Sequence, residues 1–85
     1  MSGSSYDYTL NSRCVAVVLK AGKRAHILET LFSRLAAAPF TLGDYRETDA
    51  SGRVVEVLLH EEWLVTFWTD HAVKMVNIVD VESVG

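Results

Sequence analysis

The sequence predicts an α+β domain in which one main amphipathic helix packs on one face of a small, mostly antiparallel sheet. Two observations on the residue pattern favour this class. The second half of the chain holds β-rich runs separated by short polar breaks, and an earlier run has apolar residues at helical spacing. A third observation is length, because 85 residues suffice for one domain with a single core. The expected order of elements is β-α-(β)-β-β-β.

Residues 1–12 are rich in Ser, Gly and Tyr and show no helical or strand periodicity. We therefore expect a flexible N-terminal lead, followed by a single α+β domain over residues 13–85. An alternative stays open, because Tyr6, Tyr8 and Leu10 alternate with other residues and would suit a short edge strand. Residues 13–20 form a compact run rich in β-branched valine, which favours a first strand buried on both faces.

The helix is expected over residues 23–38. Its polar side is charged or hydroxyl-bearing, and its apolar side carries Ile27, Leu28, Leu31, Phe32 and Leu35. Pro39 ends the helix, because proline disfavours the α conformation of the residue before it. We interpret the apolar side as core, since a sheet this apolar must be covered on one face.

The remaining strands follow the helix in sequence. They are expected over residues 45–48 as an optional strand, 53–60, 63–69 and 73–81. Residues 49–52 carry turn chemistry, with Asp and Ser to bond the local backbone and Gly to take positive φ, so a hairpin is expected there. In the middle strand, Trp63 and Phe67 point to one face and Trp68 to the other, so an aromatic left exposed on either face would indicate a partner surface.

Charge is distributed unevenly along the chain, whose formal net charge is −3. Residues 13–34 hold five basic residues and one acidic residue, a sum of +4. Residues 44–82 hold three basic and nine acidic residues, a sum of −6. The sheet would therefore not attract a phosphate backbone by charge alone, whereas the N-terminal third has the charge to do so.

The single cysteine, Cys14, excludes an internal disulfide and a Cys-rich metal site. No histidine stands at metal-ligand spacing from another His or Cys, and the glycines form no phosphate-binding loop, so we expect no metal and no cofactor. No apolar stretch reaches the ~18–20 residues of a membrane span, and the N-terminus lacks signal-peptide features. These observations favour a cytoplasmic protein without membrane contact. Its small core leaves homodimerisation or coverage by a partner open.

Five side chains are the candidates for chemistry on a phosphate group: Arg46, Arg53, His60, His71 and Lys74. A histidine would transfer a proton, and cations on one sheet face would hold the phosphate and stabilise the charge that develops on it. The alternative is structural, because turns collect polar residues for conformational reasons and surface cations form salt bridges. The acidic partners expected in that case are Glu47, Glu56 and Asp70.

The stretch from residue 27 to residue 82 resembles the RelE/ParE superfamily of small bacterial type II toxins. The resemblance rests on a Leu-rich helix that closes with Ala-Pro (LFSRLAAAPF), a hairpin segment (GDYRETDASGR), an aromatic-rich middle strand and a last strand reading VNIVDVE. It implies a toxin fold with its helix packed on a twisted sheet, and an antitoxin protein whose C-terminal segment wraps the toxin. Members that cleave ribosome-bound mRNA use clustered basic residues on the later strands, whereas ParE-like members poison DNA gyrase.

The chain departs from that pattern in three ways. Its sheet region is acidic, its predicted helix is single where the family commonly has a helical hairpin, and no helix is expected after the last strand. The resemblance implies a toxin-module protein that binds an antitoxin, with mRNA cleavage through the five candidates as a further activity. The alternatives are a non-enzymatic interaction domain of the same fold and a ParE-like gyrase inhibitor.

Overall fold

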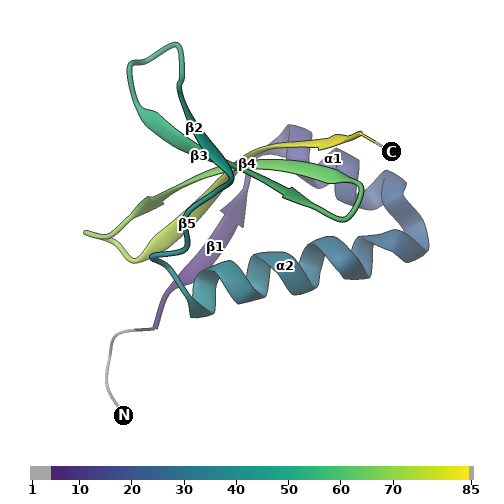
Figure 1. The fold of residues 1–85 in the computed structure, drawn as a ribbon. Coiled ribbons are helices and arrows are strands. Elements are labelled where there is room, and N and C mark those ends of the chain that lie inside the picture. The colour runs from purple at the N-terminus through teal and green to yellow at the C-terminus, as the bar shows by residue number, and fades with distance from the viewer. Residues whose placement is uncertain (1–4, 85) are drawn as a thin grey trace.

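The computed structural model describes residues 5–84, which form a five-stranded sheet covered by helices (Figure 1). The elements in chain order are β1 (Asp7–Leu10), α1 (Ser12–Ala21), the 3₁₀ turn η1 (Gly22–Arg24), α2 (Ala25–Ala37), β2 (Tyr45–Thr48), β3 (Val54–His60), β4 (Trp63–Asp70) and β5 (Met75–Ser83). The strands lie in the order β1-β5-β4-β3-β2. Only β1 runs parallel to its neighbour, so the predicted α+β class with a mostly antiparallel sheet is confirmed.

The main helix is α2, which packs along one face of the sheet (Figure 1). Its buried side chains are Leu28, Leu31, Phe32 and Leu35, four of the residues from which the helix was predicted. They belong to one core with inward side chains of β4 and β5, including Val65, Phe67, Val76 and Ile78. The helix ends at Ala37, just before the proline that was expected to stop it.

Residues 13–20, predicted as a strand, belong instead to helix α1, so that prediction is wrong. Apolar residues occupy most positions of this run, and such a run does not distinguish a buried strand from a buried helix. The deciding residue precedes it, because the Asn11 side chain accepts a hydrogen bond from the Cys14 N–H at 2.9 Å and caps the helix. The side of α1 that packs on the sheet carries Cys14, Val17, Val18 and Ala21. The helical layer therefore contains two consecutive helices.

The strand that opens the sheet is β1, which pairs with the first half of β5. The alternation of Tyr6, Tyr8 and Leu10 predicted it as the alternative to a mobile lead. Tyr8 and Leu10 pack against the core, and the Tyr8 ring centroid lies 5.5 Å from that of Phe32. The sheet thus begins before residue 13, and these half-buried side chains join β1 to the core. The first four residues of the expected lead lie outside the described residues.

The later strands form the predicted meander, with the optional strand present as β2 at the outer edge. In the β2–β3 turn the Asp49 carboxylate accepts hydrogen bonds from the N–H groups of Ser51 and Arg53, both at 2.9 Å. Gly52 in the same turn has a φ of 85°, which L side chains rarely adopt. A bulge between Thr66 and Phe67 interrupts the pairing of β4 with β5.

The sheet has one face covered by the helices and one face without a helix, which we call the open face and on which Val55 and Val57 are nevertheless buried. Trp63 and Phe67 lie on the covered face, where they are 4% and 2% exposed, and Trp68 lies half-buried on the open face. The predicted division of the aromatic residues is therefore confirmed. Neither helix within residues 5–84 has the length and apolar character to cross a membrane.

Candidate functional site

His71, in the turn between β4 and β5, is held by two aromatic neighbours from distant parts of the chain. Its Nδ1 lies 2.8 Å from the hydroxyl of Tyr6, whose ring meets the imidazole edge-on. The Phe40 ring stacks on the other side, with centroids 4.7 Å apart and planes 12° from parallel. The Asp70 carboxylate accepts a hydrogen bond from the Ala72 N–H at 3.0 Å and shapes the turn. The imidazole is thus fixed in orientation although the residue is exposed.

Arg53, at the start of β3, lies over the indole of Trp68. The guanidinium carbon is 4.0 Å from the ring centroid, a cation–π contact. Asp49 is a weaker partner, with its carboxylate 4.0 Å from the guanidinium. The side chain therefore lies along the open face, where its guanidinium contacts the Trp68 ring and lies near the Asp49 carboxylate.

Arg46, on β2, is paired with Glu56 on β3 at 2.8 Å. The Glu56 carboxylate also accepts a hydrogen bond from the Gly43 N–H at 2.7 Å. Burial opposes ionisation of Glu56, but the bonds from Gly43 and Arg46 outweigh it and hold the pKa of the carboxyl below its ordinary value. The structural alternative for Arg46, a salt bridge with Glu56, is the arrangement that the structure has.

These contacts surround a cleft of about 240 Å³, which we call the turn cleft. Its walls include Phe40, Val54, Glu56, Trp68 and His71. Two of the five predicted residues, Arg46 and Arg53, reach it through the side chains that they contact, and His71 lines it directly. The turn cleft thus combines aromatic rings, one imidazole and one ionised carboxylate.

The other two predicted residues have different positions. His60 lies at the far end of β3, opposite Trp63, and lines a separate cavity of about 250 Å³ with Arg34. Lys74 lies in the same turn as His71, and its backbone carbonyl accepts a hydrogen bond from the Asp7 N–H at 3.1 Å. The structure therefore brings His71, Arg46 and Arg53 to one cleft and places His60 elsewhere.

Sequence reasoning missed the residues that give the turn cleft its shape. Tyr6 is 65 positions from the histidine that it contacts, so no local pattern joins them. Gly43 is needed because a Cβ there would lie 2.6 Å from the backbone oxygen of Val57. Phe40 follows the proline that ends α2, and the available signal in the sequence was an aromatic residue in a loop segment; its side chain is 75% exposed.

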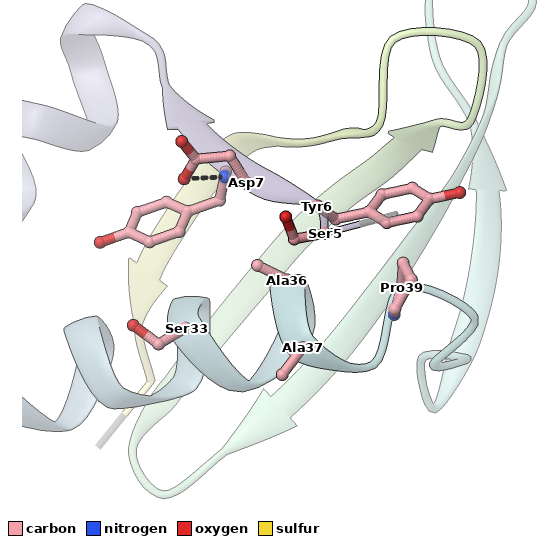
Figure 2. Close-up of a pocket in the computed structure, with 8 residues that line it drawn as sticks. Ser5, Tyr6, Asp7, Ser33, Ala36, Ala37 and Pro39 are labelled. Atoms are coloured by element: carbon pink, nitrogen blue, oxygen red, sulfur yellow. Dashed lines mark hydrogen bonds between the residues drawn. The ribbon is translucent and has the colours of Figure 1, made fainter. Parts of the chain in front are cut away.

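A larger recess, of about 440 Å³, lies between β1 and the C-terminal half of α2. Figure 2 shows Tyr6 and Asp7 on one side of it and Ser33, Ala36 and Ala37 on the other. The Asp7 carboxylate accepts a hydrogen bond from the Tyr8 N–H at 2.8 Å, which occupies a backbone donor of the sheet edge. The recess has no paired acid and base, so it supports no proton-transfer chemistry of its own.

Two further chemistries find no support in the described part of the chain. Residues 5–84 contain no group of three or more His, Cys, Asp or Glu side chains that could hold a metal ion. Burial, and then the nearby Asp80 carboxylate, raise the pKa of the Cys14 thiol above its ordinary value, which disfavours the nucleophilic thiolate. The turn cleft presents the His71 imidazole and the Glu56 carboxylate beside the rings of Phe40 and Trp68.

Comparison of the chain with protein-family models, with curated proteins and with solved structures found no match.

Proposed function

We propose that this protein is a RelE/ParE-like toxin module whose activity is to bind an antitoxin protein. Two consecutive helices on one face of a mostly antiparallel sheet support the proposal, because the resemblance implies a helical pair at that place in the chain. The sequence suggested a single helix there, so one of the three departures from the family pattern is absent. The fold is compatible with both binding and catalysis, so the two are distinguished by the side chains of the turn cleft.

The observation that favours binding is the charge of the turn cleft. Glu56 presents an ionised carboxylate on its wall, while Arg46 is paired with that carboxylate and Arg53 lies over Trp68 beside Asp49. A phosphate group entering the cleft would find both arginines already engaged, Arg46 by the Glu56 carboxylate and Arg53 by the Trp68 ring, and would have to displace these partners to reach a cation. Aromatic walls beside a carboxylate suit a side chain of a protein partner better than an RNA backbone.

Expression in a bacterial host tests the proposal. We expect growth arrest when the protein is expressed alone, and recovery when the product of an adjacent reading frame is co-expressed and co-purifies with it. The matched control is a frame-shifted gene, which keeps the RNA and removes the protein. No arrest in any host, together with no neighbouring partner gene, would favour the non-enzymatic interaction domain.

The second candidate function is mRNA cleavage, and the fixed imidazole favours it. His71 is oriented by Tyr6 and Phe40, and Trp68 offers a face on which a base could stack once Arg53 moves. We expect His71→Ala and Arg53→Ala to relieve growth arrest and restore translation if cleavage causes the arrest. The control is Arg34→Ala, which removes a cation on α2, outside the cleft. Arrest that survives these changes and Arg46→Ala, with translation intact and DNA damage rising, would point to gyrase.

A further inference from the structure

Helix α1 is apolar on two sides, although only one side packs on the sheet. On its outer side Val15 and Leu19 are 41% and 76% exposed, with Ala16 beside them. Positions four apart lie on the same side of a helix, so the two large side chains form one apolar strip. Helices that are apolar all round are normally buried. The outer face of α1, defined by Val15, Ala16 and Leu19, therefore has the composition of a surface that is covered in an assembly.

The charged residues in and just after α1 are all basic. From Ser12 to Arg24 the sequence has four basic residues and no acidic residue: Arg13, Lys20, Lys23 and Arg24. Arg13 is paired with Asp80 at 3.2 Å, and Arg24 is paired with Glu62. Lys20 and Lys23 have no acidic partner within residues 5–84. Two cations thus flank the apolar strip without compensation.

A cavity of about 390 Å³ lies beside α1 and meets this surface at Lys20. Its apolar wall is formed by Val17, Ala21, Trp63 and Val81, and Lys20, Arg24 and Glu82 also line it. Its volume lies within the ~300–1,000 Å³ typical of ligand-binding cavities. It therefore has room for an anchoring side chain of a segment that lies along α1.

We propose that the outer face of α1 docks an acidic amphipathic segment of a protein partner. The apolar side of the segment covers Val15 and Leu19, and its carboxylates face Lys20 and Lys23. The inference rests on the proposed function in holding that the protein acts by binding. It adds a second contact surface, separate from the turn cleft, and the chemistry of the segment bound there. Charge complementarity of this kind steers association and selects the partner.

Two other occupants fit less well. A second copy would bring α1 against α1, and the helix carries cations and no carboxylate, so a symmetric pair would place like charges together. A membrane surface is disfavoured because the outer face of α1 has no aromatic residue to anchor at the lipid interface and only two large apolar side chains, Val15 and Leu19.

Site-specific photocrosslinking in the native cells tests the proposal. A benzophenone amino acid replaces Leu19, which is exposed enough to accept it, and Thr30 on α2 and Tyr45 on β2 serve as exposed control positions. The crosslinked peptide is mapped by mass spectrometry. We expect the Leu19 probe to label one protein segment with alternating acidic and apolar character, well above labelling from Thr30.

The mapped segment is then synthesised and its affinity is measured by fluorescence anisotropy. We expect Leu19→Ser, and separately Lys20→Glu with Lys23→Glu, to weaken binding about tenfold or more, a change of about 1.4 kcal/mol. Arg34→Glu, which reverses a charge on α2, should leave the affinity within about twofold.

The outcomes separate this inference from the proposed function. Labelling from Tyr45 without labelling from Leu19 would overturn docking on α1 and leave a binding role intact. No labelling from any position would overturn both. A Leu19 adduct with a second copy, with lipid, or with a segment that lacks acidic residues would overturn the acidic partner. Size-exclusion chromatography with light scattering and flotation with vesicles of phosphatidylcholine and phosphatidylglycerol identify the first two cases.

Discussion

Gly43 occupies a position at which the fold leaves no room for a side chain. A Cβ added there would lie 2.6 Å from the backbone oxygen of Val57. We expect Gly43→Ala to destabilise the protein by about 1–3 kcal/mol in urea unfolding, because backbone atoms must move apart. The control is Gly52→Ala, which meets no atom within 4 Å and strains only its φ of 85°. A loss at Gly43 no larger than that at Gly52 would contradict the steric argument.

Ionisation of Glu56 stabilises the folded protein, so we expect the free energy of unfolding to fall when this carboxyl is protonated. Its folded-state pKa is lowered by the bonds from Gly43 and Arg46, which outweigh burial. A lowered pKa stabilises the fold above the unfolded carboxyl pKa of about 4.3, and this contribution is lost as pH falls through the folded value. We expect Glu56→Gln to lower the urea midpoint at pH 7 and to flatten the acid limb between about pH 5 and pH 3.

The control for that measurement is Glu29→Gln, which makes the same change in net charge on the exposed surface of α2. Asp49 also has a lowered pKa, through its hydrogen bonds from Ser51 and Arg53, so part of the acid limb should remain in Glu56→Gln. An acid limb of unchanged slope would show that the Arg46–Glu56 pair contributes nothing to folding.

At the scale of elements, the start of α1 depends on one side chain. Asn11 accepts a hydrogen bond from the Cys14 N–H and donates one to the Val79 carbonyl at 2.8 Å, so it joins the helix to β5. We expect Asn11→Ala to cost about 1–2 kcal/mol of folding free energy, measured by thermal and urea unfolding. The exposed neighbour Ser12→Ala should stay within about 0.5 kcal/mol. Equal effects of the two changes would contradict the role of the cap.

The elements that could be predicted from the sequence are those whose residue pattern has a single period. The apolar side of α2 repeats at helical spacing, and buried positions alternate with more exposed ones along β3 and most of β4. The sequence of β5 was recognised by its β-rich composition between polar breaks. The run of α1 is apolar on both sides, and its strand-like composition hid the helix that Asn11 begins. The parallel pairing of β1 with β5 joins the two ends of the chain, and no local signal reports it.

The candidate site was predictable only in part, for the same reason. Residue types identified His71, Arg46 and Arg53, but the contacts that decide their roles come from Tyr6, Phe40 and Trp68. The expected salt bridge between Arg46 and Glu56 is present, and it places a carboxylate in the turn cleft where a nuclease would need free cations. His60 was grouped with the others because it also lies near a turn, but that turn is at the opposite end of β3.

For the whole molecule, we expect the lowest local stability at β2, the outer strand of the sheet. The core joins both helices to β4, β5 and β1, and every residue of β2 is exposed. We expect native-state hydrogen exchange to be slowest for amides of β4 and β5 and to proceed in β2 through local openings of lower free energy. Binding of a segment on α1 can be detected in the same measurement. We expect it to slow amide exchange in α1 and η1 and to leave exchange in β2 fast. Protection of β2 as strong as that of β4, or slowing confined to β2 when the segment binds, would contradict this division of the molecule.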